Sequence, residues 1–184
     1  PPLETLFPYT TLFRSQLHRD LYQYSGKDIG GRFKNTQNMI AETKADGTQV
    51  VRFTSLPPYE TPAAIDAICE SFNQVIDSCV IDSLVLIPAF IHDFLCIHPF
   101  NDGNGRMSRL LTTLLLYRCG YMVGRYISIE SKIEKTKSNY YDALEKSGIG
   151  WYEESNDPSP FIKYILGIIL ASYRDFESRM SLVD

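Results

Sequence analysis

The hydrophobic positions of this chain follow two different periods, and each period predicts a different kind of element. From Pro62 onward, apolar residues recur every three or four positions, which is the repeat of a helix with one buried face. In the first such segment the apolar positions are Ile65, Ile68, Cys69, Phe72 and Ile76. Four further helices are expected at residues 82–96, 104–119, 128–146 and 160–180. This part of the chain therefore predicts a mainly α-helical protein.

Residues with known preferences for helix ends support these boundaries. Pro62 suits a first helical turn, where its missing N–H is not needed. Ser128 is placed to cap the helix that follows it, and Gly120 suits the end of the helix before it. Pro88 falls inside the second helix, so we expect a kink there.

Before Pro62 the pattern is different. A short amphipathic stretch, "QLHRDLYQY", is followed by the glycine-rich "SGKDIGGRF", which we expect to be a loop. Two β-prone runs, "NMIAE" and "TQVVRF", flank "TKADG", and the Asp46-Gly47 pair is typical of the turn between antiparallel strands. The predicted fold class is therefore mainly α, a helical bundle with one small β-hairpin.

Composition narrows the class of protein. The 184 residues are about one domain long, and a hydrophobic content of 44% is enough to form a core. The formal net charge of -4 argues against nucleic-acid binding through a general basic face. The longest apolar runs, "LVLIPAFI" and "YILGIILASY", are too short to span a bilayer. We therefore expect a soluble protein that binds neither nucleic acid nor membranes.

The cysteines indicate a reducing compartment. No two of them form a CxxC pair, and all lie among the apolar residues of predicted helices; they are Cys69, Cys79, Cys96 and Cys119. We expect reduced core residues and a cytoplasmic protein.

The first fifteen residues have a different character from the rest. The stretch "TLFPYTTLFRS", Thr5 to Ser15, resembles the conceptual translation of a common DNA-sequencing adapter. We therefore treat residues 1–15 as non-native and residues 16–184 as one domain, truncated at its N-terminus. The alternative is an ordinary apolar N-terminal arm.

The richest concentration of chemistry lies in "IHPFNDGNGRMSR", Ile97 to Arg109. His98 precedes Pro99, which disfavours further α conformation, so the histidine is expected at a helix end. Phe100 is the large apolar residue of the loop and is expected to plug into the core. His98 has a pKa suited to proton transfer near neutrality, although a hydrogen-bonded structural histidine is the alternative.

The "DGNG" segment and the helix after it predict an anion cradle. Glycines at 103 and 105 allow close approach of a ligand to unpaired helical N–H groups. Arg106 and Arg109 share one helix face with Thr113, and we expect them to grip phosphate oxygens. The remaining arc is filled by Met107, Leu110, Leu111, Leu114 and Leu115. The alternative for the arginines is an ion pair with a carboxylate elsewhere.

Two kinds of metal site come into question. Asp102 beside a phosphate would be repelled unless a hard cation lay between them, so it is a candidate Mg²⁺ ligand; alternatively it only caps the next turn. His92 and Cys96 are four residues apart on one helix face, as zinc ligands can be. Because no second ligand pair has suitable spacing, zinc is disfavoured.

The motif resembles the core signature of the Fic family (filamentation induced by cAMP), His-x-Phe-x-Asp/Glu-Gly-Asn-Gly-Arg-x-x-Arg. "HPFNDGNGRMSR" fills every defined position, and "GRFKNTQNMI", "NYYDAL" and "PFIKYI" extend the resemblance. It implies a helical Fic-type core with a hairpin flap over the active site. It also implies Mg²⁺-dependent transfer of AMP from ATP to a Ser, Thr or Tyr hydroxyl of a target protein, with self-modification a further possibility.

The resemblance also implies roles for individual residues. His98 would be the general base and Asp102 the Mg²⁺ ligand. The nucleotide would be bound by Asn101, Gly103, Asn104, Gly105, Arg106, Arg109, Tyr140 and Tyr141, with Asn156 a weaker candidate. The flap that positions the target would be formed by Met39, Ile40, Val50 and Val51.

One family feature is absent from the sequence. Many Fic proteins carry an inhibitory helix, Ser/Thr-x-x-x-Glu-Gly/Asn, and no glutamate here precedes Gly or Asn. That helix is expected upstream of the truncation, on a separate protein, or lost. The motif leaves other activities open: a Doc-like kinase, another nucleotidyl or phosphocholine transfer, removal of AMP, or a noncatalytic nucleotide-binding or interaction module.

Overall fold

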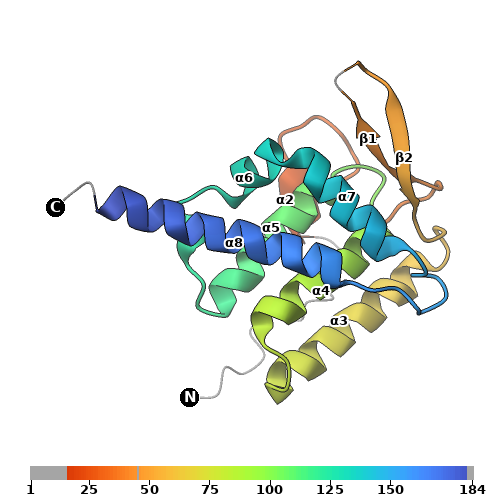
Figure 1. Cartoon of the computed structure of the whole chain (residues 1–184). Coiled ribbons are helices and arrows are strands. Elements are labelled where there is room, and N and C mark those ends of the chain that lie inside the picture. Colours follow the sequence, from red (N-terminus) through yellow and green to blue (C-terminus); the bar gives the residue numbers. More distant parts are fainter. Residues whose placement is uncertain (1–15, 45, 182–184) are drawn as a thin grey trace.

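The computed structural model describes residues 16–44 and 46–181, so the segment 1–15 interpreted above as non-native lies outside the described residues. Within this part, the helices form one packed body and a short antiparallel hairpin stands at its edge, which confirms the predicted fold class (Figure 1). The helices are α2 Leu17–Tyr22, α3 Thr61–Ser78, α4 Ser83–Ile97, α5 Asn104–Arg118, the 3-10 helix η2 Val123–Arg125, α6 Ile129–Lys135, α7 Lys137–Gly148 and α8 Ser159–Met180. The strands are β1 Met39–Thr43 and β2 Gln49–Thr54.

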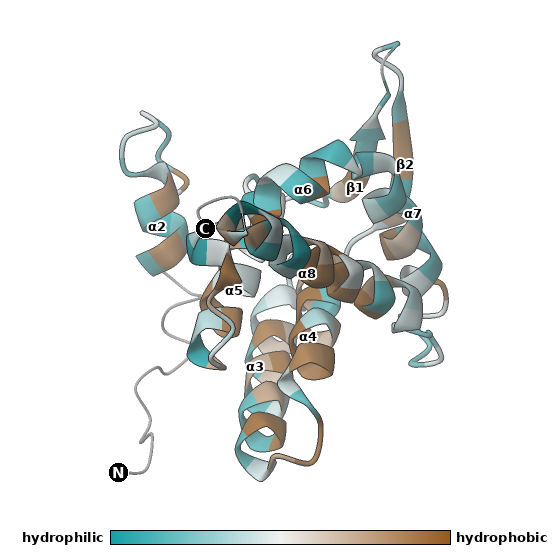
Figure 2. Ribbon diagram, turned by 60° about the vertical axis from the view of Figure 1, so that its left-hand side comes forward, coloured by the Kyte–Doolittle hydropathy of each residue, from teal (hydrophilic) through white to brown (hydrophobic). Residues whose placement is uncertain are grey.

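Helix α4 is the centre of the core. It packs against α3, α5, α7 and α8, and it is apolar along most of its length (Figure 2). A helix that is hydrophobic on nearly all sides is expected to be enclosed by others. Its buried side chains are Ile87, Pro88, Phe90, Ile91, His92, Phe94, Leu95, Cys96 and Ile97. None of the described helices is both long and apolar enough to cross a membrane.

The helix ends follow the local chemistry of the sequence. Asp82 caps α4 by accepting a hydrogen bond from the Leu84 amide at 2.8 Å. Ser128 caps α6 by accepting one from the Ser131 amide at 3.0 Å. Gly120, with φ of 88°, follows α5 in the left-handed conformation that glycine adopts without strain. The predicted signals at Ser128 and Gly120 are therefore confirmed.

The single helix predicted over residues 128–146 is wrong, because it is divided at Thr136. This residue leaves the helical conformation, with φ of -121° and ψ of 32°. Its hydroxyl donates to the Lys132 carbonyl at 3.0 Å and lies 2.7 Å from the Tyr164 hydroxyl of α8. A threonine hydroxyl that bonds back to the preceding turn competes with regular helix geometry, and the contact with α8 fixes the break.

One prediction about buried positions is also wrong, and one residue of the apolar arc of α5 is exposed. Cys79 is exposed at the end of α3, where it takes the left-handed conformation with φ of 54°, although Cys69 and Cys96 are buried as expected. Leu110 is 41% exposed on α5, because the neighbouring helices cover only the side of α5 that carries Met107 and Leu111. All four cysteines are free thiols.

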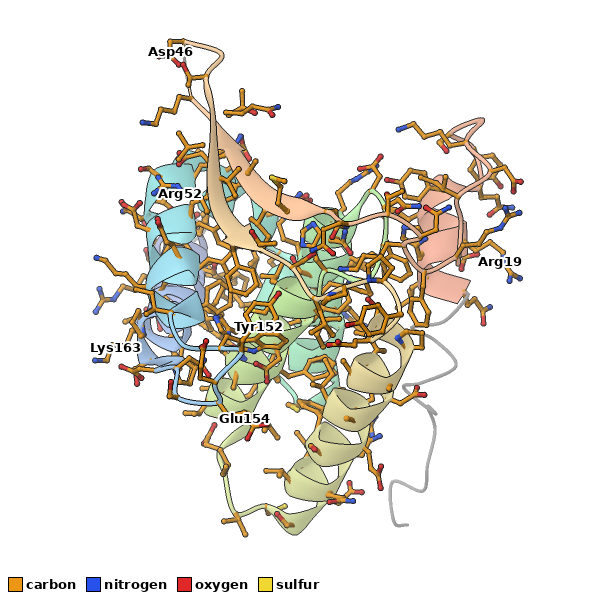
Figure 3. All side chains as sticks on the ribbon, turned by 90° about the vertical axis from the view of Figure 1, so that its right-hand side faces the viewer. Arg19, Asp46, Arg52, Tyr152, Glu154 and Lys163 are labelled. Carbon is orange, nitrogen blue, oxygen red and sulfur yellow. The ribbon has the colours of Figure 1, made fainter. Side chains whose placement is uncertain are left out.

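The hairpin projects from the helical body beside α7 (Figure 1), with Asp46 at its tip (Figure 3). Arg52 of β2 binds Glu42 of β1 and, across the gap to α7, Glu145, each at 2.5 Å. At the base, the Tyr152 hydroxyl donates to the Thr54 carbonyl at 2.9 Å. These contacts hold the hairpin in one orientation relative to α7.

Candidate active site

A cavity of about 270 Å³ lies where the hairpin, the end of α4, the motif loop and α7 meet. Its walls come from segments far apart in the sequence. They are formed by Asn38, Met39, Ile40, Ala41, Leu95, His98, Asn101, Asp102, Gly103, Asn104, Gly105, Arg109, Tyr140, Tyr141 and Leu144.

His98 ends α4 and faces this cavity from a strained position. Its backbone is left-handed, with φ of 52°, because Pro99 prevents the helix from continuing. The ring Nδ1 lies 3.2 Å from the Leu95 carbonyl, which can only accept, so Nδ1 carries the proton and Nε2 is the basic nitrogen. Burial lowers the pKa of His98 to about 4, so the imidazole is neutral at physiological pH.

The loop after His98 is held by its own side chains. Phe100 is fully buried and stacks on His18 at 3.8 Å, as expected for a residue that plugs into the core. Asn104 accepts from the Phe100 amide at 2.9 Å and donates to the Phe100 carbonyl at 2.6 Å. The side chain of Asn104 is thus used within the loop, and its backbone N–H is the group that remains for a ligand.

Gly103 allows α5 to begin at the floor of the cavity. Its φ is 84°, and a Cβ on it would lie 2.8 Å from the Tyr22 hydroxyl. The first helical bond of α5 joins the Met107 amide to the Gly103 carbonyl at 2.8 Å. The N–H groups of residues 104–106 therefore have no partner within the helix, which is the arrangement that binds anions.

Asp102 is paired with a lysine from the loop after α2. Its Oδ2 accepts from Lys27 at 3.0 Å, and its Oδ1 accepts from the Gly103 amide at 2.7 Å. The hydrogen bond from Lys27 is the main reason that the pKa of Asp102 is lowered. Among the described residues, no three His, Cys, Asp or Glu side chains cluster closely enough to hold a metal. Asp102 is the carboxylate of the cavity wall, so it is the residue that could supply a ligand to a Mg²⁺ ion, in place of its bond with Lys27.

The two motif arginines have different partners. Arg106 donates to the Tyr22 hydroxyl and lies over the Tyr22 ring, 4.8 Å from its centre. Arg109 lines the cavity, and its Nε donates to Glu130 of α6 at 3.0 Å. The two arginines were predicted to share one helix face, but Arg106 contacts Tyr22 and Arg109 contacts Glu130. Arg106 is not part of the cavity wall.

The profile of the Fic/DOC family matches residues 10–116, which is more than half of the chain. The chain belongs to this family. It is 31% identical to a protein adenylyltransferase Fic of Drosophila grimshawi and 26% identical to the adenylyltransferase fic-1 of Caenorhabditis elegans, each over 82% of this chain. It spans about a quarter of the length of these relatives, 26% and 25%. A crystal structure of a Fic family protein from Desulfovibrio desulfuricans shares the fold, with a TM-score of 0.67 and 24% identity, over 88% of this chain and 45% of that one.

The hairpin contributes to the Fic cavity through one strand. Met39 and Ile40 of β1 line the cavity, as does Ala41. Val50 and Val51 of β2 do not line the cavity, and their role in a flap that positions the target stays a prediction. Strand β2 contacts the helical body at another place, through Arg52, whose guanidinium binds Glu145 of α7.

The predicted nucleobase residues are divided in the same way. Tyr140 and Tyr141 both line the cavity, their rings 5.5 Å apart, and burial raises the pKa of Tyr140. Asn156 lies outside it, and its amide donates to the Ser147 carbonyl at 3.0 Å. The side chain of Asn156 therefore stabilises the end of α7 and does not face the cavity.

His92 and Cys96, the pair disfavoured as zinc ligands, lie on α4 and are buried in the core. Cys96 Sγ lies 3.6 Å from His92 Nε2, and burial raises the pKa of the Cys96 thiol. A zinc site needs at least one further ligand, and none joins this pair in the described part of the chain.

Residues of the first fifty positions support the motif and were not predicted from the sequence. His18 accepts from the Gly31 amide at Nδ1, 2.9 Å, so its Nε2 carries the proton and donates to the Asp102 carbonyl at 3.0 Å. Tyr22, Lys27 and Lys34 also support the site from this region. Nothing in their local spacing indicates these long-range partners; the resemblance of "GRFKNTQNMI" to the family was the available signal.

Proposed function

We propose that this chain is a protein adenylyltransferase, which transfers AMP from ATP to a Ser, Thr or Tyr hydroxyl of a target protein. One observation carries the proposal: a neutral histidine, a helix N-terminus with unused N–H groups and an arginine line one cavity. The names of the relatives support the same reaction. A noncatalytic module would need the cradle but would have no use for the base.

In this reaction His98 Nε2 accepts the proton of the target hydroxyl as its oxygen attacks the α-phosphorus of ATP. The new oxygen–phosphorus bond forms as the bond to the β-phosphate oxygen breaks, and pyrophosphate leaves with that electron pair. The N–H groups at the start of α5 stabilise the charge on the phosphates, and Arg109 binds them from the cavity wall. Mg²⁺ held by Asp102 and phosphate oxygens would neutralise charge on the leaving group.

The hairpin is the proposed site for the target segment. Its strand β1 borders the cavity next to His98, so an extended segment paired with that edge would bring its hydroxyl to the base. The contacts of Arg52 with Glu42 and Glu145 would hold this edge in place before the target binds.

The test is intact and peptide mass spectrometry of the purified chain incubated with ATP and Mg²⁺, alone and with cell lysate. Addition of AMP to the chain or to a lysate protein is expected, and it should be lost without Mg²⁺. Addition of phosphate alone would replace the proposal with a kinase. No modification, despite demonstrated folding and ATP binding, would favour another donor or a binding role and would contradict AMP transfer.

Glu130 is expected to oppose ATP binding, because its carboxylate holds the Nε of Arg109 that the phosphates would use. Replacing Glu130 with glutamine should lower the Kd for Mg-ATP by about two- to fivefold, a small effect because the Glu130 side chain is 65% exposed. Isothermal titration calorimetry measures it. Glu134→Gln, on the same helix but paired with Lys137, is the matched control. Weaker binding by Glu130→Gln would contradict this role.

A further inference from the structure

Lys34 is a buried cation that has no role in the reaction described above. It lies in the loop before β1 and is only 3% exposed. Its ammonium donates to the Ile97 carbonyl at 2.7 Å, to Ser55 Oγ at 2.9 Å and to Asn38 Oδ1 at 3.1 Å. All three acceptors are neutral, and burial lowers the pKa of Lys34 to about 8. A buried lysine without a carboxylate partner is unusual in a protein interior, because burying its charge is unfavourable.

These three acceptors belong to the two parts that must meet in the active site. Asn38 immediately precedes β1 and Ser55 immediately follows β2, so they are the two roots of the hairpin. Ile97 is the last residue of α4, directly before His98. A single ammonium group therefore joins both ends of the hairpin to the turn that carries the proposed base.

Further hydrogen bonds join the loop before the hairpin to the backbone of the motif. The Lys34 amide donates to the Pro99 carbonyl at 2.8 Å. The Asn38 amide group donates to the Phe100 carbonyl at 2.8 Å. The loop before the hairpin thus binds the backbone of the motif on both sides of His98, and Lys34 is the charged member of this contact.

The charge has a consequence for His98 as well as for the backbone. The carboxyl end of α4 carries a partial negative charge, which favours an ammonium at the Ile97 carbonyl. The same ammonium lies close enough to oppose a second positive charge on His98, and it adds to burial in lowering the pKa of that imidazole.

The other ionisable groups around His98 come from different elements. Asp102 and Arg109 line the cavity from the motif loop and α5, and Tyr140 and Tyr141 line it from α7. Strand β1 contributes Met39, Ile40 and Ala41, which do not titrate. The Lys34 ammonium is hydrogen-bonded to Asn38, Ser55 and Ile97, so a substitution at Lys34 removes none of the other ionisable groups around His98.

We propose that Lys34 is a positioning residue for the reaction, which holds the turn of His98 and both roots of the hairpin together and places a positive charge behind the base. The role of Lys34 in the reaction rests on the proposed function, in which His98 is the base. The contact itself does not depend on the donor nucleotide or on the target.

The test is a titration of His98 by NMR in the full chain labelled with 13C-histidine. The chain has three histidines, so the His98 signal is the one missing from His98→Ala. In Lys34→Met the midpoint of His98 should rise by about half to one pH unit, because a neighbouring positive charge has been removed. Lys34→Arg keeps the charge and should titrate as the original chain does. Lys163→Met, which removes an exposed lysine of α8, is the control for loss of charge elsewhere.

An unchanged midpoint in Lys34→Met would overturn the proposal. If neither Lys34→Met nor Lys34→Gln folds, the original chain decides: the His98 signal should show a second inflection near pH 8, where Lys34 loses its proton, and its absence would overturn the proposal. Single-turnover AMP transfer is measured alongside, and its acid limb should move with the NMR midpoint. A moved midpoint without any AMP transfer would contradict the proposed function and leave the contact between Lys34 and His98 established.

Discussion

Replacing His98 with alanine should slow AMP transfer by roughly 10²–10⁴-fold, the usual contribution of a general base, and leave the Kd for Mg-ATP nearly unchanged. The reason is that His98 lies in the cavity wall with its Nε2 available to a hydroxyl, whereas the phosphates are expected to bind the start of α5 and Arg109. Rapid-quench measurement of AMP transfer, together with calorimetry for binding, separates the two effects.

The rate of AMP transfer should also depend on pH through the protonation of His98. Because burial lowers the pKa of His98 to about 4, the base remains neutral throughout the pH range in which an ordinary histidine becomes protonated. The rate should therefore lose the contribution of the base only as the pH falls toward 4, and this acid limb should be absent from His98→Ala.

His92→Leu is the matched control for the loss of an imidazole. His92 lies on the same helix and is fully buried, but it is not part of the cavity wall. Its replacement should retain AMP transfer wherever the chain stays folded. A rate in His98→Ala equal to that of the original chain would show that the reaction does not use this base.

Phe100→Ala should have the largest effect on stability, a loss of about 3–5 kcal/mol in the free energy of unfolding. Phe100 is fully buried, stacks on His18 and is held at its backbone by Asn104. Removing the ring leaves a cavity beneath the motif loop, so the start of α5 should lose its position and Mg-ATP should bind more weakly. Chemical denaturation and calorimetry measure the two losses.

Phe72→Ala provides the comparison. Phe72 is 3% exposed in α3, and α3 contributes no residue to the wall of the active-site cavity. A similar loss of stability is expected there, with nucleotide binding retained in the folded fraction. Equal loss of ATP binding in both variants would mean that Phe100 acts through global stability and not through the motif loop.

The helices and the hairpin were predictable because their signals are local. The apolar repeat from Ile65 to Ile76 and the caps at Pro62 and Ser128 depend on neighbours within one or two turns, and the structure agrees with them. The break at Thr136 was not predictable from the same kind of pattern. It depends on a hydroxyl contact with Tyr164, 28 residues further along the chain.

The candidate site shows the same division. The motif from His98 to Arg109 is contiguous, so its residue types and its resemblance to the Fic family indicated a base, an anion cradle and a metal ligand from the sequence alone. Only the tertiary structure decided that Arg109 and not Arg106 lines the cavity, and that β1 and not β2 borders it. It also brought Lys27 to Asp102 and Lys34 to Ile97, across 75 and 63 positions of the chain. Repeats and caps reflect interactions between near neighbours, whereas such pairs exist only after the packing of α4 and α5 has fixed where the motif loop lies.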